Sequence, residues 1–239
     1  MNSAPGARGI GGKVEDILEI LWAPGRVFDR VREQKVGGYL LILALVTLAL
    51  VIPTRGLVQP YLDANIDLQL QLQAARGRPV TPEAVAAARR IGGIGYLVSS
   101  TLMVPVGAVI GGVLLLIGAK LGGARLRYGQ AMLIAALALV PRVLGTLVVA
   151  IEAALRDAPT GETLFALAIG PARFVDPATM SPAILGILAT LDVFSVWQVV
   201  LYVIGVQQVA RVDRTSGIVA AVVAWGLGTM ASLLPAFFQ

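Results

Sequence analysis

Residues 38–52 read GYLLILALVTLALVI, a run without a single charged side chain. Extended to Gln59, the run holds the ~20 residues that a helix needs to cross the ~30 Å hydrocarbon core of a bilayer. A helix satisfies its backbone hydrogen bonds within the segment, as lipid requires. This stretch therefore predicts a transmembrane helix.

The composition of the whole chain agrees with this prediction. Hydrophobic residues make up 57% and charged residues 14% of the 239 residues, and the mean hydropathy is +0.82. Soluble domains carry roughly 25% charged residues. A chain this apolar has too few polar side chains to cover its surface in water, so lipid must surround most of it. We expect an all-α, polytopic integral membrane protein.

Four further apolar runs follow the first one, each long enough to cross the bilayer as a helix. Strands of a transmembrane barrel would be about half as long and would alternate apolar and polar residues. We therefore expect a five-helix membrane domain over residues 37–239. Its predicted spans are 38–59, 94–121, 128–152, 182–208 and 217–238.

Two segments precede the membrane domain. Residues 1–12 are rich in Gly, Ala and Ser and are predicted to be a disordered tail. Residues 13–36 form an amphipathic juxtamembrane segment, in which Pro24 is well placed to start a second short helix. Charged residues interrupt both segments, so no cleavable signal peptide is expected and the first span acts as its own insertion signal.

The amphipathic segment has two interpretations. The segment has an apolar stripe, basic flanks and an amphipathic ring, and this combination is typical of a helix lying in the membrane interface. The residues that mark it are Trp22, Pro24 and Phe28. The alternative is a juxtamembrane helix that packs on the loops of the helix bundle. We favour the interfacial helix, because the first span begins only a few residues later.

Basic residues predict the orientation of the chain. Cytoplasmic segments of membrane proteins carry an excess of Lys and Arg, and here the excess falls on the side of the N-terminus. We therefore expect a cytosolic N-terminus and, after an odd number of crossings, an exterior C-terminus. The interior set is Arg8, Lys13, Arg26, Arg30, Arg32, Lys35, Lys120, Arg125, Arg127, Arg211 and Arg214, and the exterior set is Arg76, Arg78, Arg89, Arg90, Arg156 and Arg173.

The first exterior loop, residues 60–93, is too long for a simple turn. We expect it to contain one helix over 63–75 and another over 84–90. Thr81-Pro82-Glu83 has the residue types of a helix cap and first turn, and is predicted to start the second of these helices.

The residue inventory argues against an enzyme, a cofactor and a metal site. The chain has no Cys and no His, which removes thiolate chemistry, the commonest metal ligand and the commonest general base. No phosphate-binding loop or nucleophile elbow is found. The net charge is +5, and the basic residues lie beside the apolar runs. We therefore expect membrane lipids as partners and no nucleic acid.

Arg142 and Asp192 are the sharpest candidates for an intramembrane polar site. Arg142 precedes Glu152, and Asp192 follows Pro182, by the same number of residues, so helical rise puts both roughly 15 Å deep. A charge alone in lipid costs about 2.5–3.5 kcal/mol, so we expect the two to pair. The pair is either a structural clamp, which we favour, or part of a proton or solute path, and Arg55 is the alternative partner of Asp192.

One face of the second span is made of small residues. Small side chains at this spacing let another helix approach closely. We expect this face to pack within the chain, with self-association as the alternative. The predicted helix-packing glycines are Gly107, Gly111, Gly118 and Gly122.

Four stretches of the chain match a known pattern in their order and spacing. They are Trp22-Ala-Pro24-Gly-Arg-Val-Phe28, the exterior Thr81-Pro82-Glu83, the Gly122-Gly123 turn before a span with Pro141, and Leu191-Asp192-Val-Phe194-Ser-Val-Trp197-Gln198 with Leu201 and Gly205. Over residues 15–235 the chain thereby resembles the Ypt-interacting protein (Yip) family of five-span membrane proteins, in its prokaryotic branch.

The resemblance implies five helices, a cytosolic N-terminus and a place in the cytoplasmic membrane of a prokaryote. Eukaryotic relatives bind prenylated Rab/Ypt GTPases and act in vesicle traffic. We expect an integral membrane scaffold or interaction protein that organises lipids or other membrane proteins, including copies of itself. The alternative is a small transporter or channel whose path passes Arg142 and Asp192.

Overall fold

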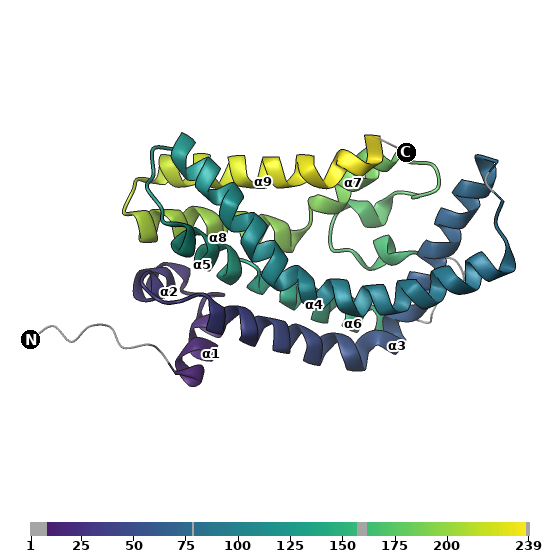
Figure 1. Ribbon diagram of the computed structural model, residues 1–239, viewed down its shortest axis with the longest axis horizontal. Coiled ribbons are helices and arrows are strands. Elements are labelled where there is room, and N and C mark those ends of the chain that lie inside the picture. The colour runs from purple at the N-terminus through teal and green to yellow at the C-terminus, as the bar shows by residue number, and fades with distance from the viewer. Residues whose placement is uncertain (1–8, 78, 157–161, 238–239) are drawn as a thin grey trace, which may run out of the picture. The chain divides into compact units, whose positions relative to one another are not determined.

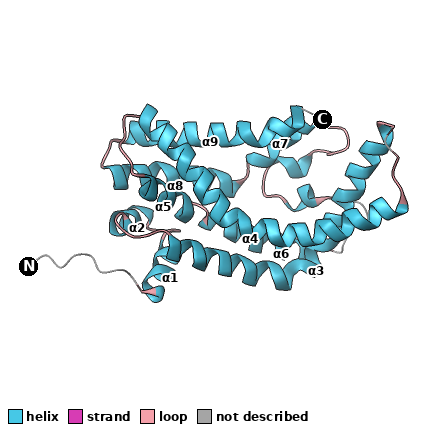
Figure 2. Cartoon of the chain, viewed as in Figure 1, coloured by secondary structure: helices cyan, strands magenta, loops and turns pink. Residues whose placement is uncertain are grey.

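The computed structural model describes residues 9–77, 79–156 and 162–237, with side chains up to Leu233. The described residues form α-helices and two short 3-10 helices joined by loops, without a strand among them (Figure 2). Five helical segments are long and apolar enough to cross a membrane, which confirms the predicted fold class. They are Gly37–Ala75, Pro82–Leu121, Tyr128–Leu155, Val193–Ala210 and Arg214–Leu233.

The chain divides into two compact units. Unit 1 comprises residues 1–46, 102–144 and 194–239. Unit 2 comprises residues 47–101 and 145–193.

The first two long helices extend beyond the predicted spans. Helix α3 runs over Gly37–Ala75 and α4 over Pro82–Leu121. At a rise of about 1.5 Å per residue, each is roughly 60 Å long, twice the thickness of the hydrocarbon core. Residues 60–93, predicted as an exterior loop with two helices, are thus helical on both sides of a short connection, and their exterior position stays a prediction. Only residues 76–81 separate the two helices, and the expected helices are extensions of α3 and α4.

The ends of α4 follow from local sequence. The amide N–H of Ala84 donates to Oγ1 of Thr81 (3.2 Å), and Pro82 is the first helical residue, as the sequence predicts. At the other end, the Ala124 amide donates to the Ala119 carbonyl (2.8 Å). Gly123 lies next to this bond at a φ of +75°, the left-handed conformation that this type of helix end requires of glycine.

The third and fourth predicted spans are each interrupted. Helix α5 (Tyr128–Leu137) and α6 (Val140–Leu155) replace one continuous helix. Pro141 lacks an N–H group and its ring crowds the carbonyl of Leu137, so the helix breaks just before it. The fourth span is split into α7 (Pro182–Thr190) and α8 (Val193–Ala210), and it was wrongly predicted as one helix.

The N-terminal segment forms two short helices, α1 (Ile10–Glu19) and α2 (Pro24–Val31), which lie beside the start of α3 (Figure 1). Residues 1–8 of the predicted disordered tail lie outside the described residues, and its last residues belong to α1. The chain ends in α9 (Arg214–Phe237), close to the predicted last span. The 3-10 helices are η1 (Leu164–Leu167) and η2 (Pro171–Phe174).

Each unit has its own apolar core. In unit 1, Ala108, Ala136 and Leu139 form a buried cluster against which Leu40 and Met132 pack. In unit 2, the buried cluster combines α3, α6 and η1 through Val58, Tyr61, Leu62, Ala153 and Leu167.

Candidate functional site

A buried carboxylate organises the N-terminal helices of unit 1. Asp16 of α1 is fully buried. Its Oδ1 accepts hydrogen bonds from Nε (2.9 Å) and Nη2 (2.6 Å) of Arg30 in α2. Its Oδ2 accepts from the Tyr39 hydroxyl in α3 (2.7 Å). Because a buried charge is costly unless it is paired and hydrogen-bonded, this triad fixes the three helices to one another.

The Arg30 guanidinium also donates a hydrogen bond to a second carboxylate. Its Nη2 donates to Glu19 Oε2 (2.5 Å), and Arg26 adds a weaker ion pair to the same side chain (3.5 Å). The hydrogen bond to Glu19, followed by the bond to Asp16, raises the pKa of Arg30 above its ordinary value. Lys13 lies over the Tyr39 ring at 5.9 Å from its centroid. We call Asp16, Glu19, Arg30 and Tyr39 the entry cluster.

Exposed ion pairs tie α2 to other loops of unit 1. Asp29 pairs with Arg211, which follows α8 (2.6 Å), and Glu33 pairs with Arg127 just before α5 (2.5 Å). Arg211 has a φ of +56°, an uncommon conformation for a residue other than glycine. The segment is therefore attached to the ends of α5 and α8, whose loops are both on the predicted interior side.

The apolar face of α2 packs on protein. Val27, Phe28 and Val31 are fully buried, and a Cβ at Gly205 of α8 would lie 3.2 Å from the Phe28 ring. The Phe28 ring therefore packs against α8 within the protein, and the interfacial position of the segment stays a prediction.

Helix α1 has the opposite character on its outer face. Ile10, Val14 and Leu18 are exposed, and Trp22, just after the helix, is 68% exposed. Their four-residue spacing places them on one side of a helix. Ile17 and Ile20 are buried beside Asp16. Pro24 is the first residue of α2 and only partly buried. We call Ile10, Val14, Leu18 and Trp22 the α1 stripe.

Sequence reasoning missed the entry cluster. Asp16 lies in a regular amphipathic pattern next to Ile17, one position away from the inner face, and nothing local shows that a carboxylate is buried there. Arg30, its partner, is in another helix, and Tyr39 is in a third. The only sequence signal is the dense mixture of acidic and basic residues in the segment.

The two predicted intramembrane charges lie next to the helix interruptions. Arg142 follows the break between α5 and α6 and has an exposed side chain, and Asp192 lies in the break before α8. The depth estimate for Asp192 assumed an unbroken helix, whereas α7 ends at Thr190, and the depth stays a prediction. Arg142 belongs to unit 1 and Asp192 to unit 2, so their ion pair stays a prediction.

Within unit 1, polar groups from two helices gather near Arg142. Gln198 donates through Nε2 to the Tyr202 hydroxyl (3.0 Å), and Arg142 interacts electrostatically with the same Tyr202 side chain. A Cβ at Gly111 of α4 would lie 2.8 Å from Tyr202 Oη. This glycine therefore makes room for the hydroxyl.

The other predicted helix-packing glycines are Gly107 and Gly118 in α4 and Gly122 just after it, and they lie near other helices of unit 1. Gly118 lies against backbone atoms of Ala220, and a Cβ there would overlap the Ala220 carbonyl oxygen. At Gly122 a Cβ would lie 2.7 Å from the Ser216 carbonyl oxygen. At Gly107, near Leu139, the contact would be an ordinary 3.6 Å. Close backbone approach thus occurs between α4 and α9, and also between Gly112 of α4 and the Met132 backbone of α5.

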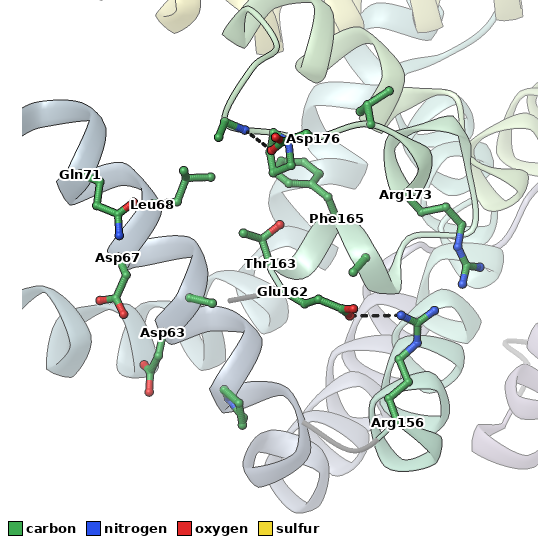
Figure 3. A pocket seen from close by; sticks show the side chains of 16 residues that line it. Asp63, Asp67, Leu68, Gln71, Arg156, Glu162, Thr163, Phe165, Arg173 and Asp176 are labelled. Carbon is green, nitrogen blue, oxygen red and sulfur yellow. Dashed lines mark hydrogen bonds and ion pairs between the residues drawn. The ribbon is translucent and has the colours of Figure 1, made fainter. Parts of the chain in front are cut away.

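Unit 2 contains a cavity of about 800 Å³. One wall is formed by α3, which carries Asp63 and Asp67, and the other by η1 and the residues before it, Arg173 of η2 and the residues after η2 (Figure 3). Among the described residues, no group of three or more acidic side chains could hold a metal ion. The sequence analysis had not identified this cavity.

These features define a multi-pass α-helical membrane protein with a docked N-terminal segment. A family model described as the Yip1 domain matches residues 18–234, and the chain therefore belongs to the Yip1 domain family. This confirms the resemblance stated from the sequence. Neither a curated protein nor a solved structure matches the chain.

Proposed function

We propose that the protein is a membrane scaffold that presents α1 to the cytoplasmic surface of a prokaryotic cell membrane. It acts by binding membrane lipids and other membrane proteins, without catalysis and without nucleic acid. The N-terminus is cytosolic and the C-terminus exterior, as the distribution of basic residues indicates.

The observation that carries this proposal is the contrast between the two faces of α1. Asp16 and Ile20 are buried on the inner face, whereas the α1 stripe is exposed on the outer one. Apolar side chains that a rigidly held helix exposes to water are energetically unfavourable, and such a patch normally marks an interaction site. Insertion of this face into the headgroup region would bury it.

Trp22 provides a direct test, because the chain has only three tryptophans. In the double variant Trp197→Phe, Trp225→Phe, fluorescence reports Trp22 alone. In phosphatidylglycerol-containing vesicles we expect strong quenching by lipids brominated near the headgroup, and weak quenching by aqueous iodide. The matched control keeps only Trp225, which lies within α9 and should respond to deeper bromines. Quenching of Trp22 by iodide alone would refute insertion.

A second candidate function is transport, and the helix interruptions favour it. Broken helices expose free backbone groups and build ion sites in many transporters. Both interruptions here lie beside a charged residue, Arg142 in one case and Asp192 in the other. A proton or solute path along these residues is the corresponding mechanism.

Liposome flux separates the two candidates. For a transporter, purified protein should accelerate proton flux under a potassium diffusion potential, and Asp192→Asn should reduce the rate about tenfold or more, since one intramembrane charge is lost. Asp213→Asn, outside the spans, is the control. Flux equal to that of protein-free liposomes would exclude proton transport and leave the scaffold proposal standing.

A further inference from the structure

One end of unit 1 carries three exposed cations, which we call the α4–α9 cations. They are Lys120 in the last turn of α4, Arg125 in the loop after it, and Arg214 at the start of α9. None of the three forms an ion pair with another described residue. The neighbouring Arg127 and Arg211 differ, because Glu33 and Asp29 neutralise them.

The close contact between α4 and α9 brings the three cations together. A Cβ at Gly122 would lie 2.7 Å from the Ser216 carbonyl oxygen, so the chain is in contact at these two positions. Each cation is two or three residues away from one of them. At about 3.8 Å between consecutive Cα atoms, their backbones lie within about 12 Å of the contact. Figure 1 shows the connections before α5 and before α9 at the same end of the unit.

The acidic residue nearest in sequence does not neutralise this group. Asp213 directly precedes Arg214, but its Oδ1 accepts a hydrogen bond from the Ser216 amide (3.1 Å) and thereby caps α9. Hydrogen bonds from Ser216, first from its side chain and then from its backbone, lower the pKa of Asp213. One carboxylate beside three cations leaves the group with a net positive charge, which favours an anionic partner.

Exposed aliphatic side chains show which kind of anion fits. On α4, Ile117 is 43% exposed and precedes Lys120 by three residues, and on α9, Ile218 is 42% exposed and follows Arg214 by four. Residues at these spacings are neighbours on one face of a helix. Both helices thus change from apolar to cationic towards their shared end. A soluble acidic partner would match only the cations, whereas a phospholipid matches both parts.

We propose that the α4–α9 cations bind the headgroup phosphate of an anionic phospholipid, whose acyl chains lie along Ile117 and Ile218. Basic groups between transmembrane helices bind such headgroups. Choline and ethanolamine headgroups carry a positive charge that offsets their own phosphate, so the site distinguishes anionic lipids from them. The inference rests on the proposed lipid-binding function and names the class of lipid.

Native mass spectrometry of the detergent-purified full chain tests the site, with phosphatidylglycerol and phosphatidylcholine of equal chain length as competing probes. We expect the wild type to retain phosphatidylglycerol at least about tenfold more strongly. Arg125→Gln combined with Arg214→Gln should reduce this preference about fivefold or more, because two charge-assisted contacts are lost. The control, Arg76→Gln with Arg90→Gln, removes two exposed cations of unit 2 and should bind as the wild type does.

The wild-type chain keeps the proposal falsifiable if the double variant fails to fold. Its preference should weaken strongly when the ionic strength is raised about tenfold, since salt screens exposed charges. Equal retention of the two lipids overturns the proposal, as does an unchanged preference in the double variant or an equal loss in the control. Displacement of phosphatidylglycerol by free glycerol phosphate or by a hexaglutamate peptide also overturns it, because the occupant would then be a soluble phosphate or an acidic protein segment.

Trp22 quenching separates this inference from the proposed insertion of α1. If Trp22 inserts into vesicles and the wild type shows no lipid preference, the anionic-lipid site alone fails. If the preference holds while Trp22 stays in water, the insertion of α1 fails and the site remains, because the two measurements report on different surfaces.

Discussion

At the scale of single residues, the position of Asp16 explains why α1 and α2 are attached to the bundle. A carboxylate loses its hydration when it is buried, and only close donors compensate for that loss. Arg30 and Tyr39 provide these donors from two different helices. The hydrogen bonds that compensate for burial of the Asp16 carboxylate therefore also determine which face of α1 points outward.

Replacement of Asp16 should release the segment. In Asp16→Ala the Tyr39 hydroxyl and part of the Arg30 guanidinium lose their acceptor, so we expect a loss of about 2–3 kcal/mol in the free energy of unfolding. The measurement is the unfolding midpoint in mild detergent. Cleavage by trypsin near Arg26 should become faster.

Asp29→Ala is the matched control for Asp16→Ala. It also removes a carboxylate that bonds to an arginine, but the Asp29–Arg211 pair is exposed on both sides. Exposed pairs contribute about 0–1 kcal/mol. A loss of stability in Asp29→Ala as large as in Asp16→Ala would show that burial of Asp16 is not what holds the segment.

At the scale of elements, α4 and α9 are in backbone contact because neither presents a bulky side chain at the crossing. Gly118 lies on the Ala220 backbone, and Gly122 lies near the Ser216 carbonyl. Within lipid no hydrophobic driving force holds two helices together. Small residues at the crossing allow close backbone approach, so that dispersion contacts can do so instead.

Gly118→Ala should separate these helices. The added methyl group meets backbone atoms, which cannot rotate away, so we expect a destabilisation of about 1–3 kcal/mol in detergent unfolding. Gly226→Ala, in α9, is the control, because a Cβ there meets nothing within 4 Å. It should be neutral or slightly stabilising, since alanine favours helix. If both variants behaved alike, the close crossing would not contribute to stability.

The elements that could be predicted from the sequence are those governed by local rules. Apolar runs located all five spanning segments, and Thr81-Pro82 located the start of α4. A helix over 63–75 was predicted, but its continuity with the first span was missed, because hydropathy shows where lipid contact ends and not where a helix ends. The break at Leu191 and Asp192 has no proline that would predict it.

The candidate sites were less predictable for a related reason. The entry cluster joins side chains from three helices, and the cavity joins Asp63 to Thr163 and Asp176, far along the chain. Such combinations depend on how the helices pack, and one sequence does not encode them locally. Arg142 and Asp192 could be identified from the sequence because charged residues are rare within apolar spans, where lipid makes them costly.

At the scale of the whole molecule, the proposed orientation fixes which features meet the cytosol. It places the α1 stripe and the ion pairs of Asp29 and Glu33 inside the cell. It places the ends of α3 and α4 around residues 76–81 and the cavity that contains Asp63 outside.

Thiol labelling checks this orientation, because the chain has no cysteine and any introduced thiol is unique. Arg125→Cys lies between α4 and α5, and Thr179→Cys lies between η2 and α7; both positions are exposed. Since basic residues are retained on the cytoplasmic side, a membrane-impermeant maleimide added to intact cells should label Thr179→Cys and spare Arg125→Cys until lysis. The cysteine-free parent controls for background. The reverse pattern would invert the protein in the membrane, and labelling of both positions in intact cells would contradict a transmembrane path between them.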